Sequence, residues 1–120
     1  IVVSGQGGVE AAVEAMKALV ADCSEQNVPS IIENLIYPLR DEAPLSPEAR
    51  ADAIIEAAVL IDDLKPSLLK LEYPGSPEAC KRLASRLTVP WAVLSAGVSS
   101  DEFARVLRIS CDEGGASGFI

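Results

Sequence analysis

The fold is decided by the stretch LLKLEYPG, residues 68–75, which reads as a short apolar strand that ends at a proline and a glycine. Directly after it, Ser76, Pro77 and Glu78 supply an N-cap, a first-turn proline and an early acid, which together predict the start of a helix. The same three residue types recur at 46–48, before another segment with helical periodicity. A strand followed at once by a helix, in a repeated arrangement, is the unit of a parallel sheet.

The alternation of strands and helices extends over the whole chain. Short apolar, β-branched runs predict strands, and apolar residues at helical spacing predict helices. The predicted strands are residues 1–4, 28–37, 67–73, 90–96 and 116–120, and the predicted helices are 9–26, 53–64, 79–87 and 101–112. The fold class is therefore α/β with parallel strands.

Two architectures fit this order of elements. A flavodoxin-like doubly wound sheet is complete in about the length of this chain, whereas a (β/α)8 barrel needs roughly 250 residues. The chain opens on Ile1 without an initiator methionine and stops at Ile120 in an apolar run, which favours part of a barrel. We therefore expect residues 1–120 to be a single partial domain, the second half of a (β/α)8 barrel truncated at both ends.

Composition excludes several kinds of partner. The chain has 18 acidic and 10 basic residues, a formal charge of −8 and a pI near 4.4, so a nucleic-acid backbone would be repelled. Its apolar runs are much shorter than the ~20 residues that a membrane span needs. We expect a cytoplasmic protein that binds neither nucleic acid nor membrane; whether the full-length protein is a homo-oligomer stays open.

The residue types also limit the chemistry. Histidine is absent, which removes the commonest zinc ligand and the commonest acid-base group at neutral pH. Cys23, Cys80 and Cys111 form no CxxC pattern, so reduced structural thiols are expected. The pairs Asp41-Glu42 and Asp62-Asp63 are predicted to be solvated, with no role in metal binding. We therefore expect no metal and no cofactor, and chemistry by carboxylate, lysine, tyrosine or serine.

Lys70 is the first candidate for that chemistry. An ammonium group inside an apolar strand is costly unless it is paired or discharged. Burial favours the neutral amine, which can attack a carbonyl carbon and form a Schiff base. The structural alternative is that Lys70 points to the sheet edge, or pairs with Glu72 two residues further on.

Glu33 is the second candidate. It stands among Ile31, Ile32 and Ile36, so its carboxylate is expected to be buried and suited to proton transfer. The alternative is a structural ion pair with a neighbouring strand. Because the same ends of parallel strands meet at one face, Glu33, Lys70 and Ser95 are expected to converge there.

Two further features lie at predicted strand ends. Tyr37 and Tyr73 are expected either to donate hydrogen bonds at the same face or to be packing residues with a wet hydroxyl. The stretch LSAGVSSDE, residues 94–102, combines a glycine turn with a helix start, which suits an anion such as phosphate. In the alternative reading, Ser99 or Ser100 caps the helix and no ligand binds, and the neighbouring acids would repel a phosphate that they faced.

Four motifs in this order resemble one known family. They are IIENLIY (31–37), LLKLEYPG (68–75), PWAVLSAGVSSDEF (90–103) and GASGF (115–119), and the family is that of the tagatose 1,6-bisphosphate aldolases and sulfofructose-phosphate aldolases, which are class I aldolases. The likeness runs from about Pro29 to Ile120. It implies a (β/α)8 barrel, with this chain running from about the fourth strand into the eighth.

The resemblance also implies roles for individual residues. Lys70 would form the Schiff base with the keto substrate, and Glu33 would transfer protons. Ser95, Ala96 and Gly97 would contact the substrate's phosphate, with Glu72 and Tyr37 as supporting residues in our reading.

The function that the resemblance implies is cleavage of a phosphorylated ketose to dihydroxyacetone phosphate and an aldehyde. The alternatives are another lysine-dependent aldolase, of the deoxyribose-phosphate or fructose-bisphosphate type, a non-catalytic barrel that binds a sugar phosphate or a protein partner, and a self-contained flavodoxin-like domain. Retention of both Lys70 and Glu33 favours catalysis, because a sensor needs neither an imine nor proton transfer.

Overall fold

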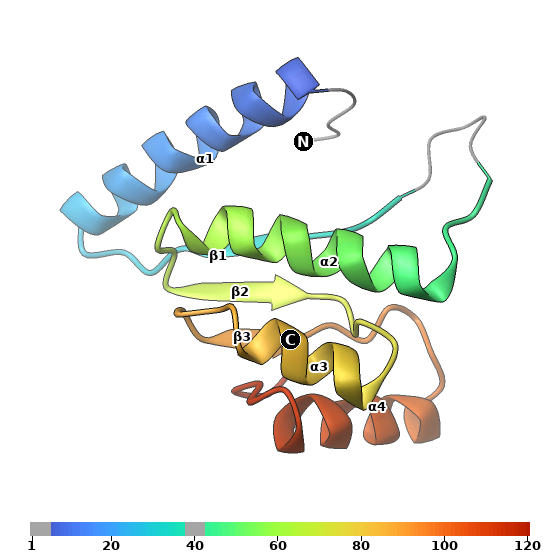
Figure 1. Cartoon of the computed structure of the whole chain (residues 1–120). Coiled ribbons are helices and arrows are strands. Elements are labelled where there is room, and N and C mark those ends of the chain that lie inside the picture. The colour runs from blue at the N-terminus through green and yellow to red at the C-terminus, as the bar shows by residue number, and fades with distance from the viewer. Residues whose placement is uncertain (1–5, 38–42) are drawn as a thin grey trace.

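The computed structural model describes residues 6–37 and 43–120. Within them, helices and strands alternate as the sequence predicts (Figure 1). The helices are α1 (Gln6–Glu25), α2 (Pro47–Asp62), α3 (Pro77–Ala84) and α4 (Ser100–Asp112), and the strands are β1 (Ile31–Asn34), β2 (Leu68–Leu71) and β3 (Trp91–Val93). The strand predicted at 1–4 lies outside the described residues.

The three strands form one parallel sheet in the order β1-β2-β3. Helix α2 connects β1 to β2 and α3 connects β2 to β3, and both helices lie in front of the sheet in Figure 1. Right-handed crossovers between strands that follow one another in order place successive helices on the same face. This is the arrangement of a barrel wall, whereas a doubly wound sheet reverses its order and carries helices on both faces.

The hydrophobic core lies between the sheet and these helices. On β2, Leu69 and Leu71 are fully buried, while Lys70 between them points to the other face, because successive strand residues alternate. The cluster is completed by residues of all three helices that flank the strands and of β3, namely Ile55, Ala58, Ile61, Leu83, Trp91, Val93 and Val106. The Lys70 side chain therefore leaves the sheet on the face that this core does not use.

Serine caps begin three of the helices. The hydroxyls of Ser46, Ser76 and Ser99 each accept a hydrogen bond from the amide three residues further on, at 3.2, 3.1 and 3.3 Å. Proline occupies the first turn of α2 and α3, where its missing N–H costs nothing. These predicted helix starts are confirmed, and of Ser99 and Ser100 the cap of α4 is Ser99.

The strands are shorter than predicted. Ladder pairing needs a partner strand in register, and β1 and β2 pair only from Ile31 opposite Leu68 to Asn34 opposite Leu71. The predicted strand at 116–120 is reduced to a single parallel bridge between Val93 and Phe119. The predicted strands were too long because apolar residues continue beyond the positions that form hydrogen bonds with a neighbouring strand.

Asp62 is not solvated, so that prediction is wrong. Its side chain is only 4% exposed and accepts hydrogen bonds from the amides of Thr88 and Val89, at 2.8 and 2.9 Å, and from the Thr88 hydroxyl at 2.7 Å. Lys65 also donates to it at 3.1 Å. Asp63 is exposed as predicted, and Asp41-Glu42 lies outside the described residues. Asp62 thus ties the end of α2 to the segment that leads into β3.

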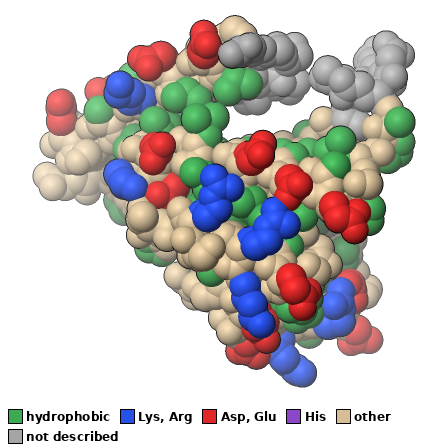
Figure 2. Space-filling view, in the orientation of Figure 1, with side chains coloured by type: hydrophobic (Ala, Val, Ile, Leu, Met, Phe, Trp, Pro, Cys, Tyr) green, Lys and Arg blue, Asp and Glu red, His purple; other side chains and the backbone are tan. Residues whose placement is uncertain are grey.

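The surface is mixed in character. Figure 2 shows acidic and basic side chains interspersed on one face, with hydrophobic atoms visible between them. Helix α1 lies to one side of the sheet and adds Met16 to the margin of the core, while Leu19 stays 61% exposed. Among the described helices, none has the length and apolar character needed to cross a bilayer. The three cysteines are free thiols, as predicted.

Candidate active site

Lys70 and Glu33 face each other across the β1–β2 ladder. They are register partners in the parallel pairing, and the Lys70 Nζ lies 3.0 Å from the Glu33 Oε1. Both side chains therefore leave the same face of the sheet, opposite to Leu69 and Leu71. The structure brings together the two residues that the sequence predicted to be catalytic.

The environment of this pair differs from the prediction. Glu33 was expected to be buried among isoleucines, but its side chain is 42% exposed, because the alternation of β1 turns Ile32 toward the core and Glu33 away from it. The Lys70 side chain is 24% exposed. The ion pair with Glu33 and partial contact with water offset the unfavourable free energy of placing the Lys70 ammonium group in an apolar strand.

Glu72 does not pair with Lys70, so that alternative is wrong. One of its carboxylate oxygens accepts a hydrogen bond from Arg50, on α2, at 2.5 Å, and the other accepts from the amide of Ile36 at 2.8 Å. Arg50 also donates to the carbonyl of Ile36 at 3.2 Å. The two ion pairs, Lys70 with Glu33 and Arg50 with Glu72, are therefore separate.

The loop after β3 holds the predicted phosphate-binding residues. Ala96 and Gly97 have φ angles of 50° and 73°, so two successive residues are left-handed before Ser99 begins α4. For alanine this conformation is unfavourable, and such backbone strain is often found at functional sites. The loop leads directly into the N-terminus of a helix, whose dipole and free amides attract anions.

A cleft of about 190 Å³ lies beside this loop. Ser95 and Ala96 line it together with Arg50, Glu72 and Glu102, whereas Gly97 is not part of its lining. Arg105 donates to both carboxylate oxygens of Glu102, at 3.0 and 2.6 Å, which offsets the repulsion that this acid would exert on a phosphate. Glu72, which directly follows β2, thus shares this cleft with Ser95 and Ala96, whereas Lys70 and Glu33 do not line it.

The two tyrosines play no common role. Tyr37 is 75% exposed beyond the end of β1, and the structure does not bring it to Lys70. Tyr73 packs against the core, with the Arg105 guanidinium 6.0 Å from the centre of its ring. Burial, and next the nearby Cys80, raise the pKa of the Tyr73 phenol. Tyr73 is therefore a packing residue, but its hydroxyl is buried with no hydrogen-bond partner among the described residues, so the expected wet hydroxyl is wrong.

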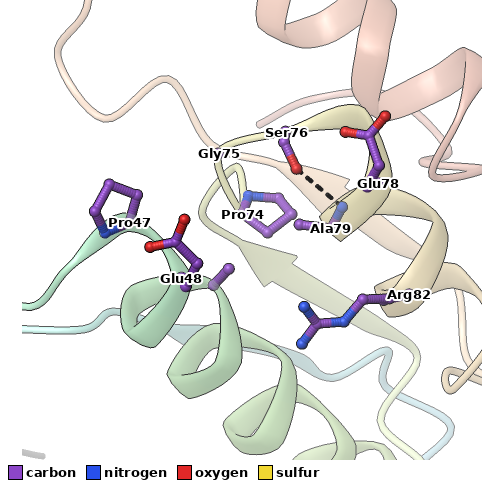
Figure 3. Close-up of a pocket in the computed structure, with 9 residues that line it drawn as sticks. Pro47, Glu48, Pro74, Gly75, Ser76, Glu78, Ala79 and Arg82 are labelled. Carbon is purple, nitrogen blue, oxygen red and sulfur yellow. Dashed lines mark hydrogen bonds between the residues drawn. The ribbon is translucent and has the colours of Figure 1, made fainter.

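A second hollow, of about 160 Å³, lies between the N-terminal turns of α2 and α3 (Figure 3). Its walls carry Glu48 and Glu78 on two different helices, and the side chain of Arg82 lies along one side. Arg82 is ion-paired with Asp52. None of the residues that line this hollow is a predicted site residue, so it is separate from the Lys70–Glu33 pair.

Arg50 is a residue of this site that the sequence did not single out. It lies near the start of α2, where an arginine ordinarily reads as a solvated helix residue. Its partner Glu72 is 22 positions further along the chain, so only the packing of α2 on the sheet brings the two together. No local pattern could have identified the contact.

Comparison with known proteins places the chain in a family. A family model described as DeoC/LacD family aldolase matches residues 1–120. Among solved structures, a Schiff-base-forming fructose-1,6-bisphosphate aldolase aligns with a TM-score of 0.76 and 17% identity over 98% of this chain. An archaeal fructose-1,6-bisphosphate aldolase, solved with its catalytic lysine covalently bound to the carbinolamine intermediate of the substrate, aligns with a TM-score of 0.75 and 16% identity.

The chain spans about half the length of these structures, since it covers 46% of each. At this identity the likeness establishes the fold, and it confirms the expected α/β architecture of a partial (β/α)8 barrel over the flavodoxin-like alternative. Because the family model matches every residue from 1 to 120, the chain belongs to the DeoC/LacD family of aldolases.

Proposed function

We propose that this chain is part of a class I aldolase that cleaves a phosphorylated ketose through a Schiff base on Lys70. The observation that carries the proposal is the Lys70–Glu33 pair, with 3.0 Å between amine and carboxylate, in a chain that belongs to an aldolase family. A general base must lie within hydrogen-bond reach of the proton that it removes. Glu33 meets that condition for the lysine itself.

In the first half of the reaction, Glu33 accepts a proton from the Lys70 ammonium and frees the amine. The amine attacks the substrate's C2 carbonyl to give a carbinolamine. Glu33 returns its proton to the carbinolamine hydroxyl, which leaves as water, so a protonated iminium forms and Glu33 is again a carboxylate. The iminium draws electrons from the neighbouring carbon, so the C3–C4 bond can break to give an enamine in place of a bare carbanion.

In the second half, proton transfer completes the cleavage. Glu33 takes the proton of the C4 hydroxyl as the C3–C4 bond breaks, and the aldehyde leaves. A proton then returns to C3, and water hydrolyses the iminium, which releases dihydroxyacetone phosphate and restores the Lys70 amine. Every step uses side chains of this chain and water.

The phosphate of the substrate binds, in this proposal, at the loop after β3. Ser95 offers a hydroxyl, and the left-handed turn at Ala96 and Gly97 exposes backbone amides next to the N-terminus of α4. Glu72 supports the site through its contact with Ile36. A supporting role for Tyr37, which is 75% exposed, belongs to the same proposal and rests on the resemblance.

For the substrate, we propose a ketose of the tagatose 1,6-bisphosphate or sulfofructose 1-phosphate type, on the strength of the four motifs. We further propose that residues 1–120 form the second half of a barrel, from about the fourth strand to the eighth. The coverage of 46% of each matched structure supports this reading.

The experiment that tests the proposal is a cleavage assay on the full-length protein that contains this chain. Tagatose 1,6-bisphosphate, sulfofructose 1-phosphate and fructose 1,6-bisphosphate are offered in turn, and release of dihydroxyacetone phosphate is measured. We expect turnover of one of them, a loss of roughly 10³-fold or more in Lys70→Met, and a loss of about 10² to 10⁴-fold in Glu33→Gln.

The matched control is Lys81→Met, because Lys81 is an ion-paired lysine, 62% exposed, on the outer helix α3. It should leave turnover unchanged. Turnover that survives in Lys70→Met would contradict the Schiff-base mechanism. Binding of the sugar phosphates with no turnover of any of them would favour the non-catalytic alternative.

A further inference from the structure

Glu72 is one of few buried charged side chains in this structure. Among the described residues, the buried polar or charged ones are Asp62, Glu72 and Ser110. The Glu72 side chain is 11% exposed and lines the cleft beside Ser95 and Ala96, and its carboxylate is bonded to Arg50 and Ile36. A charge held in such a place requires strong partners.

The partners of the Glu72 carboxylate are Arg50 and the amide of Ile36, and Arg50 also bonds to the carbonyl of Ile36. The Ile36 amide donates to Glu72 at 2.8 Å, and the Ile36 carbonyl accepts from Arg50 at 3.2 Å. Arg50 and Glu72 are bonded to each other at 2.5 Å. The backbone ladder between β1 and β2 ends before this point, at Asn34 opposite Leu71. Beyond this point, hydrogen bonds of the Arg50 and Glu72 side chains take the place of the backbone hydrogen bonds between the two strands.

This network is closely linked to the reacting pair. Ile36 lies three residues beyond Glu33, just past the end of β1, and Glu72 lies two residues beyond Lys70, directly after the end of β2. The same two strands are therefore connected twice, once by the Lys70–Glu33 pair at 3.0 Å and once by the Glu72–Ile36 bond. A shift of the chain at Ile36 would carry Glu33 with it.

We propose that Arg50 and Glu72 are positioning residues that hold the exit of β1, and thereby keep the Glu33 carboxylate in reach of Lys70. This inference rests on the proposed function. Arg50 has a second effect, because it neutralises Glu72. Without Arg50, the buried Glu72 carboxylate would lose the cation that compensates its charge.

The test uses the full-length protein, with Glu72→Gln, Arg50→Met and the double variant. Saturating dihydroxyacetone phosphate with borohydride first counts the Lys70 sites that form an imine, which normalises for any protein that has not folded. Cleavage is then measured per such site, across pH. Arg82→Met is the matched control, because Arg82 pairs with Asp52 between the outer helices, with 55% of its side chain exposed.

We expect each single variant to lower kcat per site by about 10 to 100-fold, with KM within about 3-fold, since a misplacement of ~1 Å can cost that much. The pH profile of kcat should change as well, because Glu33 carries the proton. The double variant should be no worse than the single variants, as expected of residues that act as a unit. The control should stay within about 2-fold of the parent.

The outcomes separate this inference from the one on which it rests. An unchanged kcat per site and an unchanged pH profile, in variants that still form the adduct, would overturn the positioning role alone. Fewer adduct-forming sites with a normal kcat at each would show a purely structural role and would overturn it too. No adduct in the parent protein would overturn the proposed function, and this inference with it.

Discussion

Asp62 gives the sharpest prediction about stability. Burial by itself would raise the pKa of its carboxyl, but the hydrogen bonds from Val89, Thr88 and Lys65 outweigh burial and lower that pKa from its ordinary value of 3.8 to about 2. At ~1.36 kcal/mol for each unit of pKa, this lowering stabilises the folded state by about 2 kcal/mol at neutral pH. Solvent screening of this contribution is small, because the Asp62 side chain is 4% exposed.

The sign follows from the direction of the change. The pKa is lower in the folded state, so the contribution is fully present above the unfolded value near 4 and is lost as the pH falls toward 2. Replacement of the carboxylate by an amide, Asp62→Asn, removes it at every pH. The difference in the free energy of unfolding between the parent and Asp62→Asn should therefore shrink by about 2 kcal/mol between pH 6 and pH 2.

The assay is urea denaturation of the full-length protein at a series of pH values. The matched control is Asp63→Asn, since Asp63 is the neighbouring carboxylate but is exposed at the end of α2. It should change the free energy of unfolding by less than about 0.5 kcal/mol, with little dependence on pH. A parent-to-Asp62→Asn difference that stays constant from pH 6 to pH 2 would refute the reasoning.

Two further predictions follow from the packing around β3. A Cβ added at Gly114 would lie 2.8 Å from the Ser110 carbonyl oxygen and 2.9 Å from a ring carbon of Trp91, so Gly114→Ala should cost about 1 to 3 kcal/mol of unfolding free energy, seen as a lower denaturation midpoint. A variant as stable as the parent would contradict this packing. Burial raises the pKa of the Cys80 thiol to about 11, so iodoacetamide at pH 8 should alkylate Cys111 well before Cys80, as read by peptide mass spectrometry. Equal rates at the two thiols would show that Cys80 is accessible.

The helix starts could be predicted because their determinants are local. Ser46, Ser76 and Ser99 each accept a hydrogen bond from an amide three residues away. Both partners of such a contact lie within a few residues of each other, so the local sequence is enough to predict it. The meeting of Lys70 with Glu33 could also be expected, because parallel strands bring corresponding positions together once the strands are recognised.

Longer-range contacts could not be predicted in the same way. The burial of Asp62 depends on amides 26 and 27 residues further along the chain, and an Asp-Asp pair at a helix end ordinarily reads as solvated. The pairing of Arg50 with Glu72 depends on how α2 packs on the sheet. Glu33 was expected to be buried because its neighbours are apolar, whereas strand alternation sends it to the opposite face.

Reductive trapping shows whether Lys70 forms a Schiff base. The full-length protein is incubated with dihydroxyacetone phosphate and borohydride, and the added mass is located by peptide mass spectrometry. We predict one triose-phosphate adduct, on Lys70, that is absent in Lys70→Met and still present in Lys81→Met. A folded protein that gains no adduct, or that carries it on another lysine, would rule out a Schiff base on Lys70.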